Sequence, residues 1–404
     1  MEHATTRFGS VDWASSRHAA CVVDHAGTIV DQFEVPHTGA GLTDLCRRFR
    51  RLRVCRVAIE RPDGPVVDAL MGAGIEVVVV ASRAVKALRE RYGLAGNKDD
   101  RSDAFVLADC LRTDGHRWRS LQPDSPQTVA LRAAVRARKD LVAARIAATN
   151  QLRAHLELVF PGAVGLFADL ASPIALTFLE RFPTAAKAAW LTERRMAAWL
   201  RANEYCGRTS ASDLMRRLDS AASGQRGSLA VAHPPVTRSL VRVLRVLIAE
   251  TAALEAQIAE QLDNHPDGFI FQSLPRSGTV RAAAMLAEIG DCRARFPTPD
   301  SLAALAGAVP STRRSGKLHV VTFRWSCDKK LRDALVDFAQ DTRRANAWAD
   351  RLYRKHRAAR KSHPHAARIL TRAWIDVIWR CWQDRTAYHP DRHRALQRVT
   401  HMAA

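Results

Sequence analysis

Two aspartates, Asp100 and Asp103, lie three residues apart where an apolar helical pattern begins. This spacing puts both carboxylates on one helix face, where like charges destabilise an isolated helix by roughly 0.2–0.5 kcal/mol. A divalent cation bound between them would remove that repulsion. Two further acids, Asp12 and Glu60, each follow a short strand-like apolar run. We therefore expect all four acids to converge as catalytic residues that share a metal site.

These four acids suit a reaction at a phosphodiester. The negative charge of this linkage repels nucleophiles, and one or two Mg²⁺ ions neutralise the developing charge and align the attacking and leaving groups. Mg²⁺ prefers oxygen ligands, so carboxylates from separate elements suit it. We expect Mg²⁺ as the cofactor, with Mn²⁺ able to substitute. Each acid alone also has an ordinary explanation as a strand end, a turn residue or a helix cap, so the prediction depends on their joint order.

Cations flank the aspartate pair at Lys98 and Arg101. Either side chain could bind the scissile phosphate in a nucleic acid or simply soften the repulsion between the carboxylates. Asp99 lies about 100° from Asp100 around the helix, so we expect it to face away from the site.

The charge of the chain points to a nucleic-acid partner. Its 404 residues are enough for two or three domains. They carry 62 Lys and Arg against 41 Asp and Glu, a formal charge of +21, and such an excess of positive charge favours binding to nucleic acid.

Eight scattered cysteines without a Cys-x-x-Cys pair argue against a zinc site or a disulfide framework. No signal-peptide core or membrane-spanning run is found. We expect a cytoplasmic protein and no membrane partner.

Apolar runs separated by turns predict an α/β domain over residues 1–118. The expected elements are strands at 8–14, 18–23 and 29–35, a helix at 40–53, a strand at 54–60, a short helix at 66–71, a buried strand at 75–81 and a helix that runs to 111. Acids after two strands, followed by an aspartate pair on a helix, are the order in which an RNase H-like nuclease assembles its acidic site. The expected fold class of this domain is therefore α/β RNase H-like.

Two long helices are predicted in the middle region, residues 119–265, at about 129–159 and 236–262. In the second helix, leucines and one isoleucine recur at alternating spacings of four and three, with Thr251 filling a gap, as in a coiled coil. These residues are Leu240, Leu244, Leu247, Leu254 and Ile258. The periodicity leaves open whether the two helices pack within one molecule or mediate dimerisation. The insert at 165–232 gives little information.

Residues 266–404 are predicted to form a basic and mostly α-helical C-terminal domain. Between Arg313 and Lys361 there are fifteen Lys or Arg and five Asp, which favours a phosphate-facing surface. A glycine turn before a predicted helix presents free backbone N–H groups, which bind phosphate well. Nucleic-acid-binding residues are expected in this turn and in the later basic segment: Arg276, Ser277, Gly278, Thr279, Arg313, Arg314, Gly316, Lys317, Lys329, Lys330 and Arg332.

Ser315 lies in a glycine-containing turn ringed by these cations. Nearby positive charge lowers the free-energy cost of forming an alkoxide-like nucleophile, so this serine could attack phosphorus. The ordinary alternative is that it is only a turn residue.

Together these motifs resemble the DEDD transposases of insertion-sequence family 110. The N-terminal resemblance lies in Val-Asp12-Trp-Ala, Ala-Ile-Glu60 and Gly-Asn-Lys-Asp-Asp100-Arg-Ser-Asp103-Ala. The C-terminal resemblance lies in Leu-Pro-Arg-Ser-Gly278, Glu288-Ile-Gly-Asp291, Leu-Ala-Gly307-Ala-Val-Pro310, Arg-Arg-Ser315-Gly316 and Leu331-Arg332-Asp-Ala-Leu335. It covers about 8–115 and 270–390, whereas the middle matches only in being helical.

The resemblance implies a RuvC-like first domain and a recombinase guided by a structured non-coding RNA that pairs with donor and target DNA. It implies that the acidic site and a serine of the last domain form one composite centre, in which the serine becomes covalently linked to DNA. By motif position this serine is Ser315, with Ser311 and Ser277 as alternatives. Recombination needs several active sites on one synapse, so we expect a dimer or tetramer. The resemblance also implies a bacterial protein that is associated with the nucleoid when it acts.

The chain departs from the family pattern at two places. Arg276 takes the place of the first glycine in a Pro-Gly-x-Gly turn, so we expect that turn to have a different shape and to bind phosphate through a side chain. Further on, residues 325–330 read Trp-Ser-Cys-Asp-Lys-Lys where the family tends to have Lys-x-Gly-Asn.

Three other functions fit parts of the sequence pattern. The first is a hydrolytic RuvC-like junction endonuclease, in which water attacks and Ser315 takes no part. The second is an actin-like ATPase or a sugar kinase, which would need a glycine-rich phosphate loop after the first strand, and residues 14–18 are a poor match. A simple RNA-binding module is disfavoured because four acids would repel phosphate unless a metal intervened.

Overall fold

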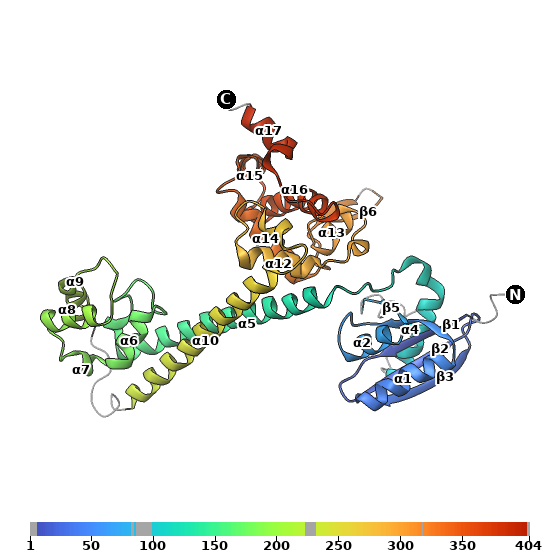
Figure 1. Cartoon of the computed structure of the whole chain (residues 1–404), viewed down its shortest axis with the longest axis horizontal. Coiled ribbons are helices and arrows are strands. Elements are labelled where there is room, and N and C mark those ends of the chain that lie inside the picture. The colour runs from blue at the N-terminus through green and yellow to red at the C-terminus, as the bar shows by residue number, and fades with distance from the viewer. Residues whose placement is uncertain (1–5, 82–84, 86–98, 223–231, 317, 402–404) are drawn as a thin grey trace. The chain divides into compact units, whose positions relative to one another are not determined.

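The computed structural model describes residues 6–81, 85, 99–222, 232–316 and 318–401. Contacts divide the chain into two compact units, Met1–Pro123 and Asp124–Ala404 (Figure 1). The further division of the chain at residue 265 stays a prediction.

The first unit contains a mixed five-stranded sheet with the strand order β3-β2-β1-β4-β5. The strands are β1 Arg7–Asp12, β2 Arg17–Val23, β3 Ile29–Pro36, β4 Val54–Ile59 and β5 Glu76–Val79. Neighbours β1, β2 and β3 pair antiparallel, whereas β1, β4 and β5 pair parallel. The predicted strands are confirmed, with ends that differ by at most two residues.

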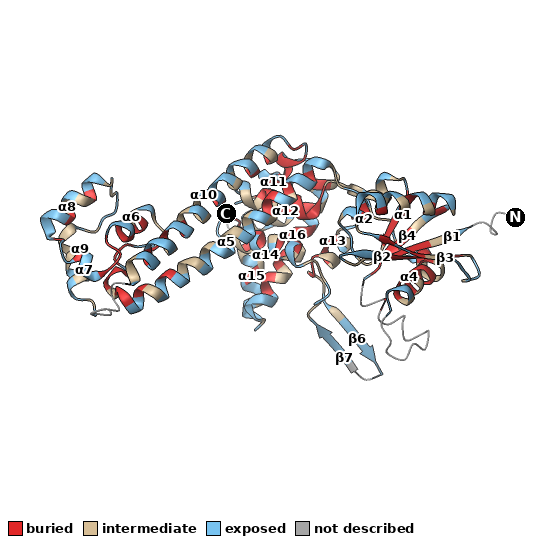
Figure 2. Ribbon diagram, turned by 90° about the horizontal axis from the view of Figure 1, so that it is seen from below, coloured by how far each residue is buried: buried red, intermediate tan, exposed pale blue. Residues whose placement is uncertain are grey.

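Helices cover both faces of this sheet (Figure 2). On one face lie α1 Gly39–Arg51 and α2 Pro65–Gly72, and on the other lies α4 Asp100–Asp114, which leads into a 3₁₀ turn at Gly115–Arg117. Thr38 caps α1 and Asp99 caps α4 through their side-chain oxygens. A mixed five-stranded sheet followed by a mostly helical chain is compatible with the predicted RNase H-like fold.

In the second unit two long helices, α5 Pro126–Val159 and α10 His233–Asp263, run side by side (Figure 1). Leu131 near the start of α5 shares a core with Ile258 near the end of α10. Leu156 near the end of α5 shares another core with Leu244 near the start of α10. The two helices are therefore antiparallel.

The predicted heptad pattern of α10 faces its own chain. Leu244, Thr251 and Ile258 are buried, whereas Leu247 and Leu254 are only partly buried. Packing within one molecule is thus observed, and a coiled coil that joins two molecules stays a prediction.

The insert between these helices forms a small helical subdomain at one end of the pair. Its helices are α6 Pro173–Arg181, α7 Ala185–Ala188, α8 Glu193–Ala202 and α9 Ala211–Asp219, preceded by a 3₁₀ turn at Pro161–Ala163. Phe178 and Met196 are almost completely buried in its core.

The rest of the unit packs around α16 at the other end of the pair. Its elements are α11 Gly268–Gln272, α12 Thr279–Ile289, a 3₁₀ turn Arg293–Arg295, α13 Pro299–Leu305, β6 Ser311–Ser315, β7 Leu318–Thr322, α14 Lys329–Thr342, α15 Ala347–Ala358, α16 His363–Gln383, a 3₁₀ turn Pro390–Arg392 and α17 Arg394–His401. Trp374 and Trp382 of α16 are fully buried in this core. The hairpin of β6 and β7, which the sequence analysis did not predict, projects from the helices (Figure 2).

Buried ion pairs join α5 to the end of α12. Glu288, 5% exposed, receives two hydrogen bonds from Arg136 at 2.9 and 2.7 Å. Asp124 pairs with Arg132 and accepts a hydrogen bond from the backbone N–H of Asp291. A side chain at Gly290, whose φ is +86°, would collide with the Asp124 carboxylate, so glycine is required there.

No helix among the described residues is long and apolar enough to cross a membrane.

The first prediction concerns the pair of Arg136 and Glu288. Removing one partner of a buried ion pair leaves the other charge uncompensated, so Arg136→Ala should lower the free energy of unfolding by about 3 kcal/mol. Lys139→Ala is the matched control, because Lys139 pairs with Asp333 on the surface and should contribute less than about 1 kcal/mol. Denaturant unfolding followed by tryptophan fluorescence measures this, since seven of the nine tryptophans lie in the second unit. Equal stability of the two variants would contradict the role assigned to the pair.

Candidate functional site

Asp12 and Glu60 lie at the carboxyl ends of neighbouring parallel strands. Asp12 is the last residue of β1, and Glu60 directly follows β4. The strand register pairs Val11 with Ile59, so the two acids occupy the next level of the sheet. Both are partly buried. The carboxyl edge of parallel strands is where open α/β sheets commonly bind ligands.

Alternation along the strands places both acids toward α4. Ser10 donates a hydrogen bond to the backbone carbonyl of Ala104 in α4, and Ala58 is buried in a core with residues of the same helix. Asp12 and Glu60 each follow one of these residues at a spacing of two, which returns the side chain to the same face of a strand.

Helix α4 supplies the other two acids. Asp103 is 4% exposed, and it is adjacent to Ala104, which packs on β2. Asp100 lies at the first residue of the helix and is exposed. The N-cap is Asp99, whose carboxylate accepts a hydrogen bond from the N–H of Arg101. Asp100 therefore does not serve as the cap of this helix. Within the described residues, no three His, Cys, Asp or Glu side chains are grouped closely enough to hold a metal ion. The backbone places Asp12 and Glu60 on the sheet face that α4 covers, and Asp103 is buried on α4. The shared metal site stays a prediction.

The predicted cation Arg101 has its guanidinium 3.5 Å from Glu34 of β3. Lys98, the other predicted cation, lies outside the described residues. Their roles at a phosphate stay predictions.

A histidine pair and a tryptophan lie beside the acids, and the sequence analysis did not single them out. Arg61 stacks on the Trp13 ring at 4.4 Å, and each of these residues directly follows an acid. The rings of His18 and His37 are joined by a hydrogen bond of 2.8 Å. Burial, and then the charge of His37, lower the pKa of His18. The position of Trp13 and Arg61 next to the acids was the only sequence signal for this cluster.

Ser315 is the last residue of β6, at the tip of the exposed hairpin. It pairs with Leu318, and the turn residue Gly316 has a φ of +52°. Arg313 and Arg314 on the same strand are exposed, and neither forms an ion pair with a described carboxylate. Lys317 lies outside the described residues. The hairpin therefore presents a serine hydroxyl together with unneutralised cations.

The two alternative serines have different surroundings. Ser311 begins β6, and its carbonyl accepts a hydrogen bond from Thr322 at 3.3 Å. The Ser277 hydroxyl is buried and has no hydrogen-bond partner among the described residues.

The turn before α12 has an arginine in an unusual backbone conformation. Arg276 has a φ of +59°, the left-handed conformation that glycine usually provides. The expected difference in shape from the family's turn stays a prediction. The Arg276 guanidinium is 2.9 Å from Asp341. Gly278 is the N-cap of α12 and supplies no capping side chain, and Thr279 follows as the first helical residue.

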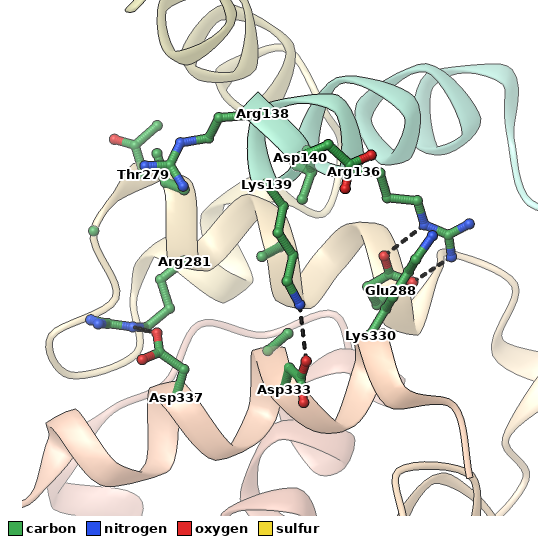
Figure 3. Close-up of a pocket in the computed structure, with 15 residues that line it drawn as sticks. Arg136, Arg138, Lys139, Asp140, Thr279, Arg281, Glu288, Lys330, Asp333 and Asp337 are labelled. Atoms are coloured by element: carbon green, nitrogen blue, oxygen red, sulfur yellow. Dashed lines mark hydrogen bonds and ion pairs between the residues drawn. The ribbon is translucent and has the colours of Figure 1, made fainter. Parts of the chain in front are cut away.

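Gly278 and Thr279 line a pocket of about 700 Å³ between α5, α12 and α14. Figure 3 shows ion pairs across it, including Lys139 with Asp333 and Glu288 with Arg136. Lys329 and Lys330 begin α14, behind the N-cap Asp328, and Lys330 lines the pocket.

The sequence of this chain is similar to those of known transposases. A model of the DEDD transposases of IS110 elements matches residues 10–161, and a model of transposases of the IS116/IS110/IS902 family matches residues 269–354. The mini-circle putative transposase for IS117 of Streptomyces coelicolor is 32% identical over 417 residues, covering all of both chains. A 43.6 kDa protein of insertion element IS110 from the same organism, described as uncharacterized, is 29% identical over 78% of each chain. A putative transposase of Sinorhizobium fredii, y4uE, is 32% identical over 56% of this chain and 68% of its own.

A relative that matches from end to end, together with a family model at each end of the chain, leaves one conclusion: the protein belongs to the IS110 family of transposases, enzymes that cleave DNA and transfer its strands.

Proposed function

We propose that this transposase cuts and rejoins DNA with Asp12, Glu60, Asp100 and Asp103 as a metal-dependent acidic site and with Ser315 as the nucleophile. One observation supports this proposal most. The strand register places Asp12 beside Glu60 on the face of the sheet that packs against α4, and α4 carries the buried Asp103. The DEDD family is generally metal-dependent.

The donor set fits a hard divalent cation, because all four ligands are carboxylates on three separate elements. Mg²⁺ is the expected ion, with Mn²⁺ able to replace it. When bound, the ion would supply charge neutralisation at the phosphodiester. Asp12, Glu60 and Asp103 would determine where the cation binds, because they are attached to a packed sheet and helix.

The Ser315 hydroxyl is accessible at the hairpin tip, which an attack on phosphorus requires. In the proposed step its oxygen bonds to phosphorus, its proton passes to a base, and one bridging oxygen of DNA leaves as a strand hydroxyl. The phosphodiester is conserved as a phosphoserine ester, so rejoining needs no external energy. Arg313 and Arg314 would offset the negative charge that develops.

The proposal includes a structured guide RNA and a homo-oligomer. The formal charge of +21 is enough to engage both RNA and DNA backbones. A second copy of the chain suits the middle of the long-helix pair, where apolar side chains are exposed. Ile146 is 55% exposed, Val243 is 51% exposed and Val246 is 59% exposed.

The second prediction concerns the acids. Asp103→Asn removes the charge while nearly keeping the shape, so metal-dependent strand cleavage should fall by about 100-fold or more. DNA binding, measured without metal by gel shift, should be unchanged. Asp99→Asn is the matched control, because asparagine caps a helix as well as aspartate does. Full cleavage activity of Asp103→Asn would contradict a role in the site.

The third prediction concerns the nucleophile. On a nicked substrate the protein should form a covalent adduct with DNA that denaturing gels and mass spectrometry detect at Ser315. Ser315→Ala should lose both the adduct and strand transfer, whereas Ser311→Ala on the same strand should keep them. Cleavage by Ser315→Ala without any adduct would instead support the hydrolytic endonuclease with water as the nucleophile.

The fourth prediction concerns the RNA partner. Protein expressed from its complete insertion element should copurify with one discrete RNA that maps to an end of that element. Nuclease treatment should abolish recombination, and the same RNA made in vitro should restore it. Copurification of only mixed host RNA, with recombination insensitive to nuclease, would contradict guidance by RNA.

A further inference from the structure

Trp325, which follows the β6–β7 hairpin, is 78% exposed. This is the highest exposure among the large apolar side chains that the structure describes. An indole gains free energy when water is removed from its faces, and flat aromatic groups that remain in water are typical of ligand-stacking sites.

The loop that carries Trp325 is held in place. The N–H of Asp328 donates to the Leu305 carbonyl at 2.8 Å, and the N–H of Cys327 donates to the Trp325 carbonyl at 3.0 Å. Gly307, with a φ of +66°, lies so close that a side chain there would come within 2.9 Å of Cys327. The indole is therefore presented by a fixed loop at the surface.

A second aromatic ring and two arginines support the indole. Phe323 lies edge-on to Trp325, with ring centroids 4.8 Å apart and planes at 90°. Arg368 lies 4.7 Å and Arg332 lies 6.0 Å from the centre of the Phe323 ring. The arrangement fixes the base of the site and leaves the indole accessible.

The surroundings carry positive charge that the protein does not fully neutralise. Lys329 and Lys330 are exposed, and neither forms an ion pair with a described carboxylate. Burial, and then the charge of Arg332, lower the pKa of Arg368, so an anion nearby would be stabilising. A flat aromatic face next to cations is complementary to a nucleobase and its phosphate.

We propose that Trp325 stacks on an unpaired nucleobase, while Arg332, Arg368 and Lys329 contact the adjacent phosphates. A base inside a duplex has both faces covered by its neighbours, so the site selects a single strand or a base displaced from a helix. This inference rests on the proposed function and extends it, because a nucleic-acid strand must reach the loop between β7 and α14, which follows the hairpin that carries Ser315.

The fifth prediction tests this site by binding alone. Full-length protein in EDTA is titrated with a labelled single strand of about 12 nucleotides, and fluorescence anisotropy is recorded. DNA, RNA and duplex DNA of the same sequence are compared. Trp325→Ala should weaken binding of a single strand about ten- to a hundred-fold, because stacking of one base contributes that much, while duplex binding stays unchanged. Trp325→Phe should restore most of the affinity.

Trp190→Ala is the matched control. Trp190 is 55% exposed and has Arg195 4.2 Å from its ring centre, yet it lies in the helical insert. This variant should bind as the wild type does.

The comparison of strands has defined outcomes for Trp325→Ala. A loss of affinity confined to single-stranded DNA or to single-stranded RNA identifies the strand that binds and supports the site in either case. Wild-type single-strand binding by Trp325→Ala, or an equal loss on duplex, would overturn the proposal. Because the assay needs neither metal nor Ser315, failure of adduct formation would leave its result intact.

Discussion

The position of the proposed acidic site depends on the parallel pairing of β1 with β4. With Val11 opposite Ile59, Asp12 and Glu60 reach the same level of the sheet, and alternation turns both toward α4. A slip of one residue would move either acid to the opposite face. Ser10 strengthens this arrangement, because its hydrogen bond to α4 fixes the helix that carries the buried Asp103.

Buried ion pairs join the helices of the second unit. Arg136 and Glu288 join α5 to α12, and Asp124 binds the turn that contains Gly290. The motif Glu288-Ile-Gly-Asp291, which contributed to the family resemblance, is therefore explained by packing rather than by contact with DNA. Helix α12 also lines, together with α5 and α14, the pocket to which Gly278, Thr279 and Lys330 contribute.

Local patterns predicted most of the elements, because alternation and helical periodicity report burial on one face. The set of four acids was also proposed from the sequence, because the spacing of Asp100 and Asp103 places two like charges on one helix face, and their joint role stays a prediction. Features set by tertiary contacts were not accessible. The hairpin around Ser315 lies in a segment that read as mostly helical, although Val320 and Val321 are residues that favour strands. The left-handed conformation of Arg276 likewise depends on its neighbours in space.

The capacity of the carboxyl edge of β1 and β4 to bind a divalent cation can be measured directly. Crystals of the full-length protein grown with Mn²⁺ would locate the ion by its anomalous scattering. We predict a peak about 2.1 Å from carboxylate oxygens of Asp12, Glu60 and Asp103. No peak at this edge, with the acidic oxygens more than about 10 Å apart, would be incompatible with shared coordination and would contradict the proposed chemistry.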